Sequence, residues 1–161
     1  MNVERKPALE SQRPAPNLLS TKNLSLFIFV LILLTNCSGT MPALIGQFRP
    51  CPDKPNCVSS KSSLRLHKIT PLTYKGTSQE ARENLLGIIK SMPRAKISTN
   101  KDNFIHVEFT SKIFRFVDDV EFYFEKLGTI HFRSASRIGN SDMGINRKRM
   151  EEIRQNFMGK N

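Results

Sequence analysis

Three arginines and a serine in the last third of the chain have the types and spacing of a site that binds an anion. Arg133 and Arg137 would share one face of a strand, and that strand would lead into a helix N-terminus near Ser141. A helix N-terminus presents unpaired N–H groups, and an arginine can bind phosphate or carboxylate through two parallel hydrogen bonds. Arg147, further along the helix, could add a third positive charge. The pattern predicts a site for phosphate or carboxylate groups.

Acidic residues in the preceding strand allow two other interpretations of the same arginines. Arg133 could pair with Glu121 across the strands. Arg137 could pair with Asp119 on the diagonal, and the two pairs together would form a structural lattice of charges. Alternatively, Asp118 and Asp119 could act with both arginines as the reacting groups of a hydrolase. Adjacent residues of a strand point to opposite faces, so the two aspartates cannot simply share one proton or one metal ion.

Asp118 falls on the apolar face of its strand, where a carboxylate must be hydrogen-bonded or must change its pKa. Ser136 would lie opposite this aspartate, and Ser134 would be the neighbour of that serine on the same face. Either the two hydroxyl groups and nearby backbone amides satisfy the carboxylate, or the three side chains form a polar pocket in the sheet. The three histidines have neither zinc-binding nor catalytic-triad spacing, and we expect no metal ion, no cofactor and no catalytic residue.

The elements that must position these side chains begin with the stretch from Ile113 to Gly139. It alternates with a period of two residues and is rich in aromatic and β-branched residues, which predicts two strands. A three-residue loop ending at Gly128 would make them an antiparallel hairpin and would keep aromatic and charged residues on separate faces. This register predicts five cross-strand pairs: Phe124 with Ile130, Phe122 with Phe132, Val120 with Ser134, Tyr123 with His131, and Glu121 with Arg133.

Two helices are predicted from their capping signals and their apolar periodicity. Thr77 begins a capping box, and the helix that follows runs to about Met92. A last helix would be capped by Asn140 or Ser141 and would run to about Phe157. Its buried stripe would consist of Met143, Met150, Ile153 and Phe157.

The remaining segments complete a prediction of the fold class. Residues 104–109 alternate strictly and predict a further strand, whereas residues 58–63 have the polar composition of an irregular segment. The order of strands and helices predicts an α+β domain with two layers, in which helices pack on one face of an antiparallel sheet. The other face of the sheet, which carries the charges, would be open to solvent or to a partner.

The N-terminal region has the features of a bacterial lipoprotein signal peptide. A basic stretch precedes a short apolar run at residues 24–34, which is far below the ~20 residues that a membrane-spanning helix needs. The following residues, Leu34-Thr35-Asn36-Cys37, resemble a lipobox, after which the chain is cut and the cysteine is lipidated. Asn36 departs from the small residue of that pattern, so an uncleaved anchor is the alternative. We therefore expect a signal peptide at residues 1–36, a tether at 37–50 and a single domain at 51–158.

Cysteine usage and charge agree with export to the cell envelope. With Cys37 as the lipid anchor, Cys51 and Cys57 remain as an even pair, and we expect them to form a structural disulfide. The net charge of +11 would suit an anionic surface or nucleic acid, but export excludes nucleic acid as a partner. The expected partners are the membrane that holds the lipid anchor and an anionic lipid, a glycan or a small anion. We expect the protein to face the periplasm, anchored preferentially in the outer membrane.

Three segments carry a resemblance to a known family: CPDKPNCVSS, FVDDVEFYF and RSASRIGNSDMGINRKRMEEIR. They resemble the uncharacterised bacterial and plastid family called domain of unknown function 1499, and the resemblance spans roughly Pro50 to Phe157. It implies a domain with these boundaries in a protein that is exported or attached to a membrane. No established reaction comes with it.

Three classes of function fit these observations. We expect a non-enzymatic lipoprotein module that binds an anionic or amphipathic ligand, or a partner in the envelope. A hydrolase that uses Asp118 and Asp119 with Arg133 and Arg137 is the first alternative, and it predicts a deep pocket that holds a carboxylate of raised pKa. A structural assembly factor is the second alternative, and it predicts an exposed patch of interface size without a pocket.

Overall fold

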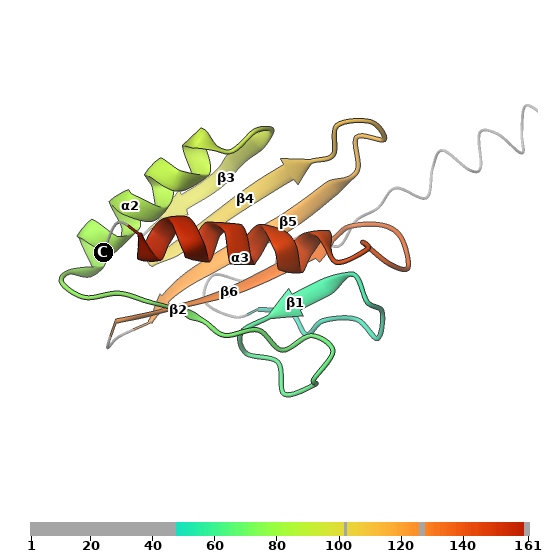
Figure 1. Ribbon diagram of the computed structural model, residues 1–161, viewed down its shortest axis with the longest axis horizontal. Helices are drawn as coiled ribbons and strands as arrows, with labels where there is room; N and C mark the ends of the chain where they lie inside the picture. Colours follow the sequence, from blue (N-terminus) through green and yellow to red (C-terminus); the bar gives the residue numbers. More distant parts are fainter. Residues whose placement is uncertain (1–47, 102, 126–127, 160–161) are drawn as a thin grey trace, which may run out of the picture. The chain divides into compact units, whose positions relative to one another are not determined.

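The computed structural model describes residues 48–101, 103–125 and 128–159 (Figure 1). The predicted signal peptide, the lipidation site at Cys37 and the tether as far as residue 47 lie outside the described residues. The strands are β1 (Cys57–Ser59), β2 (Leu72–Thr73), β3 (Ala95–Lys101), β4 (Phe104–Thr110), β5 (Val117–Glu125) and β6 (Thr129–Ser136), and the helices are α2 (Ser78–Ser91) and α3 (Ile145–Met158). No helix in this part of the chain is long and apolar enough to cross a bilayer.

The strands form one antiparallel sheet in the order β1-β6-β5-β4-β3, and β2 also pairs with β6 (Figure 1). The register of the β5–β6 hairpin is the predicted one in all five pairs. Glu125 lies opposite Thr129, so the loop has three residues, as expected. Gly128 adopts a φ of 73°, and a Cβ atom there would lie 2.7 Å from the carbonyl oxygen of Tyr74. Only glycine therefore fits this turn without a shift of the neighbouring backbone.

Both helices pack on one face of the sheet, which confirms the predicted two-layer α+β architecture (Figure 1). The capping box of α2 is formed as predicted, because Thr77 and Glu80 bond to each other's backbone N–H groups. The core lies between the helices and the sheet. Its fully buried members include Leu85 and Ile89 from α2, Met150, Ile153 and Phe157 from α3, and Ile105, Val120, Phe122 and Phe132 from the strands.

The start of the last helix differs from the prediction. The helix α3 begins at Ile145, after Gly144 in the left-handed conformation, and Met143 is 93% exposed instead of buried. The cause is Asp142, whose carboxylate accepts hydrogen bonds from the N–H groups of Gly144 and Asn146. Asp142 therefore holds a turn ahead of the helix, and this turn delays the helical conformation by several residues.

Two further expectations about the sheet are corrected. Part of the segment predicted to be irregular belongs to β1, in which Val58 lies opposite Ser134. The face of the sheet opposite the helices, here called the outer face, is not open throughout, since Asp119, Glu121 and Arg133 are all buried. These charges tolerate removal from water because they lie in ion pairs with neighbouring side chains.

The two edges of the sheet are different in kind. One edge is β3, which among the described strands pairs only with β4 and has a register shift between Ile97 and Thr99. Its exposed positions include Lys96 and Lys101. The other edge consists of the short strands β1 and β2, which pair with different parts of β6. The interior strands β4, β5 and β6 therefore make up most of the sheet.

Candidate functional site

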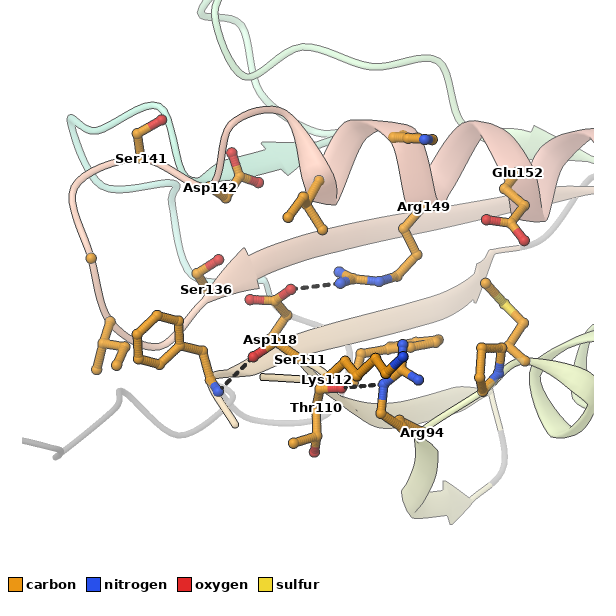
Figure 2. A pocket seen from close by; sticks show the side chains of 18 residues that line it. Arg94, Thr110, Ser111, Lys112, Asp118, Ser136, Ser141, Asp142, Arg149 and Glu152 are labelled. Atoms are coloured by element: carbon orange, nitrogen blue, oxygen red, sulfur yellow. Dashed lines mark hydrogen bonds and ion pairs between the residues drawn. The ribbon is translucent and has the colours of Figure 1, made fainter. Parts of the chain in front are cut away.

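A cavity of about 400 Å³ lies at one end of the sheet, on the side of the helices. Because the strands are antiparallel, β4 and β6 end where β5 begins, and their connecting loops meet there. The end of α2, the loop after it and the start of α3 close the remaining sides. Figure 2 shows the lining side chains, which come from all of these elements.

The floor of the cavity contains an ion pair between Asp118 of β5 and Arg149 of α3 (Figure 2). The carboxylate oxygen and the guanidinium nitrogen are 2.6 Å apart. A second nitrogen of Arg149 donates to the side-chain oxygens of Asn146 at 2.8 Å and Ser134 at 3.3 Å. The guanidinium also lies over the ring of Phe109, 4.6 Å from its centre. The partner of Asp118 is therefore an arginine of the last helix and not the hydroxyl groups of Ser134 and Ser136.

The walls of the cavity are apolar and its rim is mainly basic. The rim carries the cations Arg94, Lys112 and Lys148 and the acids Asp142 and Glu152. Neither Lys112 nor Lys148 forms an ion pair with another of the described residues. The apolar wall consists of Met92, Pro93, Phe109, Phe116, Ile138 and Ile145.

A buried polar network centred on Asn146 holds the wall on the side of β6 and α3. The amide nitrogen of Asn146 donates to the side chain of Asp142 at 2.7 Å and to the hydroxyl of Ser136 at 3.1 Å. Its amide oxygen accepts from the hydroxyl of Ser134 at 2.5 Å. The amide nitrogen also donates to the backbone carbonyl of Asn56, in the disulfide loop, at 3.2 Å. The network therefore fixes the entry to α3 against β6 and against the segment before β1.

Asn56 joins the disulfide loop to the loop between β6 and α3. Its side-chain nitrogen donates to the carbonyl of Gly139 at 2.9 Å, and its own carbonyl accepts from the backbone N–H of Ser136 at 3.0 Å. Cys51 and Cys57 form the expected disulfide on either side of it, which holds this loop closed. Two of the segments that carried the family resemblance, CPDKPNCVSS and RSASRIGNSDMGINRKRMEEIR, thus meet behind the cavity.

The outer face holds a separate group of charges around Asp119. Arg137 donates two hydrogen bonds to Asp119, at 2.7 and 2.8 Å, and a third to Glu108 at 2.6 Å. His106 lies 2.7 Å from the same aspartate. Burial alone would raise the pKa of Asp119, but the bonds from Arg137 and His106 outweigh it and hold that pKa below its usual value. Arg137 and Asp119 are therefore joined as the structural lattice predicts.

The second pair of the lattice, Glu121 with Arg133, is also present. The carboxylate oxygen and guanidinium nitrogen are 3.2 Å apart, and both side chains are at least nine-tenths buried. Burial raises the pKa of Glu121, and the charge of Arg133 opposes that change only in part. One carboxylate oxygen of Glu121 and the Nε of Arg133 are buried without a hydrogen bond to any described residue. This pair is less well satisfied than that of Asp119 and Arg137.

The structure divides the eight predicted ligand-binding residues among three places. Asp118, Ser136 and Ser141 line the cavity, and Ser134 lies beneath it with its hydroxyl on Asn146. Asp119, Arg133 and Arg137 belong to the outer face, on the opposite side of the sheet. Arg147 lies on another side of α3, where it donates to the backbone carbonyls of Leu66 and Lys68. The arginines and the helix start that were grouped as one anion site therefore do not converge.

Several cavity residues were missed because their signals are weak in the sequence. Arg149 lies three residues after Asn146 and four before Ile153, so its helical spacing from two buried residues was an available signal. The predicted strand began at Ile113, but β5 begins at Val117, so Phe116 lies with Lys112 in the loop between β4 and β5. Among the described residues, no group of three or more histidine, cysteine or acidic side chains is placed to hold a metal ion.

The comparisons with known proteins place the chain in a family without a known activity. Nothing matches this chain among the curated proteins or among the solved structures. The family model described as "Protein of unknown function (DUF1499)" matches residues 47–157, which include every described strand, the helix α2 and all of α3 except Met158. The chain therefore belongs to the DUF1499 family.

Proposed function

We propose that this domain is a non-enzymatic module that binds an amphipathic, anionic ligand in the cavity between α2, α3 and the loop from β4 to β5. The observation that carries the proposal is the cavity itself, because its apolar walls end in a rim with more basic than acidic side chains. Ligand sites commonly combine an apolar lining with a few polar groups that fix orientation.

The two parts of such a ligand would meet different parts of the site. An apolar chain would pack against Phe109, Ile138 and Ile145, and an acidic head group would lie at the rim near Lys112 and Lys148. Asp118 neutralises Arg149 on the floor, so the positive charge of the site is concentrated at the mouth. A cavity with apolar walls and a basic rim favours an amphipathic acid over a small inorganic anion as its ligand.

We prefer binding to hydrolysis because the groups required for a hydrolase are not assembled. The hydrolase alternative needs Asp118 and Asp119 in one pocket with Arg133 and Arg137. Asp118 lies in the cavity, whereas the other three lie in ion pairs on the outer face. The acid of raised pKa, Glu121, is likewise on the outer face.

We further propose that the domain works as a lipoprotein in the cell envelope, anchored at Cys37 and facing the periplasm, preferentially at the outer membrane. The lipobox-like residues before Cys37 and the basic composition support this location. The disulfide between Cys51 and Cys57 supports it as well, because such bonds persist in oxidising compartments.

The binding proposal can be tested by calorimetric titration of dodecanoate into residues 38–161, which contain the whole core and lack the cysteine of the predicted anchor. The double variant Lys112→Ala/Lys148→Ala should weaken binding by roughly tenfold, since each exposed cation contributes up to about 1 kcal/mol. Dodecanol, which lacks the charge, should bind both forms equally. The control variant Lys90→Ala removes an exposed cation of α2 that does not line the cavity. The proposal fails if dodecanoate does not bind or if all three proteins bind it equally.

A further inference from the structure

The loop of residues 111–116, between β4 and β5, presents apolar side chains to solvent. Ile113 is 77% exposed, Phe114 is 72% exposed and Phe116 is 47% exposed. In Figure 1 this loop extends past the ends of β4 and β5. Ile113 and Phe114 do not line the cavity, so the binding of a ligand there would leave their exposure unexplained. Clusters of exposed apolar side chains are a feature of surfaces that contact a protein, a ligand or a membrane.

The conformation of the loop is fixed by its own hydrogen bonds. The backbone N–H of Ser111 donates to the carbonyl of Phe116 at 2.8 Å, and the N–H of Phe116 donates to the hydroxyl of Ser111 at 2.9 Å. Arg115 has a φ of 57°, in the left-handed region that side chains other than glycine rarely adopt. The rings of Phe114 and Phe116 stack with their centres 5.5 Å apart. The loop therefore holds its aromatic rings in the exposed position before any partner is bound, which lowers the entropic cost of binding.

The charges within the loop are basic. Lys112 and Arg115 flank the apolar tip, and residues 111–116 contain no acid. The neighbouring rim of the cavity carries the cations Arg94 and Lys148 and the acids Asp142 and Glu152. Exposed aromatic and aliphatic side chains flanked by lysine and arginine suit the boundary between the head groups and the acyl chains of an anionic bilayer. An acidic protein surface would satisfy the charges but would bury the tip only if it also offered an apolar pocket.

We propose that residues 111–116 insert into the interface of an anionic lipid bilayer. Ile113 and Phe114 enter the acyl boundary, while Lys112 and Arg115 contact lipid phosphates. The mouth of the cavity is lined by Lys112 and Phe116, so docking through this loop turns the mouth toward the lipid. The inserted tip, Ile113 and Phe114, does not line the cavity, so the inference does not depend on the cavity being a ligand site.

The chain contains no tryptophan, so a single substitution supplies a site-specific fluorescent reporter. The variant Phe114→Trp of the full-length chain is reconstituted into vesicles of phosphatidylglycerol and phosphatidylcholine that contain dibrominated phosphatidylcholine. Bromine quenches tryptophan only at close range, so quenching reports insertion of this loop and not attachment of the chain by its N-terminal region. We expect a blue-shifted emission and quenching at least about threefold stronger than for an exposed tryptophan elsewhere on the domain.

Two control positions carry the comparison. Met158→Trp is exposed at the far end of α3, roughly 20 Å along the helix axis from its start near the cavity. Leu66→Trp is exposed in the segment between β1 and β2. Both reporters should remain in water and show little quenching, because neither belongs to the loop.

Charge variants then test whether the basic side chains of the loop are needed for insertion. Adding Lys112→Glu and Arg115→Glu to Phe114→Trp should remove most of the quenching, as should vesicles without phosphatidylglycerol. Adding Lys90→Ala, which removes an exposed cation outside both the loop and the cavity, should leave the quenching unchanged within about twofold. Equal quenching at all three tryptophan positions, or no quenching at residue 114, overturns the inference.

Discussion

Replacing Asn146 by alanine should destabilise the domain more than any exposed asparagine substitution, because Asn146 is fully buried and joins three segments of the chain. Its side chain bonds to Ser134, Ser136, Asp142, Arg149 and the backbone of Asn56. Alanine can make none of these bonds.

The size of the effect follows from what remains after the substitution. The hydroxyl of Ser134 is buried and loses its only acceptor among the described residues, which costs about 1–3 kcal/mol. Arg149 loses a charge-assisted bond of 2.8 Å but keeps Asp118. Asp142 keeps the backbone N–H of residue 146. Together with the small void left by the amide, these losses predict a destabilisation of roughly 3–4 kcal/mol.

Urea unfolding followed by circular dichroism measures this prediction directly. With a slope of about 1.5–2 kcal/mol per molar urea, the midpoint should fall by roughly 2 M. The matched control is Asn140→Ala, an exposed residue of the neighbouring loop, which should change the midpoint by less than about 0.3 M.

A double-mutant cycle with Ser134→Ala tests the reasoning behind the magnitude. If the two side chains bond as described, the double variant should be less destabilised than the sum of the single variants by about 1 kcal/mol or more. Additive effects, or a midpoint for Asn146→Ala that matches Asn140→Ala, would refute the role assigned to this network.

Three other predictions concern the rest of the domain. Burial raises the pKa of Glu121 above 4.5, so the folded state binds this proton more tightly than the unfolded state does. The free energy of unfolding should therefore fall as the pH rises from 4.5 through the raised pKa. Urea midpoints measured across this pH range should show the fall in the unsubstituted protein and not in Glu121→Gln. Replacing both Cys51 and Cys57 by serine opens a loop with a sequence separation of 6 and should lower the free energy of unfolding by about 2 kcal/mol. Calorimetry should show a fall of roughly 8 °C in Tm. An unchanged Tm would contradict a stabilising role of the disulfide. Ile153→Ala should cost about 2–5 kcal/mol in urea unfolding, whereas Ile113→Ala, which truncates an exposed residue, should cost less than about 0.5 kcal/mol; equal costs would contradict the described core.

The register of the β5–β6 hairpin could be predicted because its signals are local, whereas its first strand begins at Val117 and not near Ile113 as the alternation suggested. The alternation of Phe122 and Phe132 with the charged pair Glu121 and Arg133 admits one register, and Gly128 marks the turn. A slip of one residue would bury the charges against the helices. The alternation and the turn glycine therefore indicate the same register, and no tertiary contact is needed to choose it.

The start of α3 and the strand β1 could not be predicted in the same way, because distant residues set both. Ser141 has the residue type of a helix N-cap. However, Asn146 donates hydrogen bonds to Asp142 and to the carbonyl of Asn56 in the disulfide loop, and these bonds place the start of the helix further along the chain. Val58 becomes part of a strand because it pairs with Ser134 at the edge of β6. Local propensity in both segments is weak enough for these long-range contacts to override it.

The candidate site was foreseen only in part, for a related reason. The sequence placed Asp118 on the helix side opposite Ser136, and this is correct. Its partner Arg149 lies 31 residues away on another element, so no spacing rule connects the two. The charge lattice of the outer face involves neighbouring strands, and its two predicted pairs could be read from the register.

The edges of the sheet have a consequence for how copies of this protein behave when they are crowded. An unpaired strand can recruit a strand of another molecule, and this is a common route to aggregation. Here β3 interrupts that route with its register shift between Ile97 and Thr99 and with the charges of Lys96 and Lys101. The opposite edge is divided between β1 and β2, each too short to serve as a template. We therefore expect the domain to remain dispersed at high local concentration.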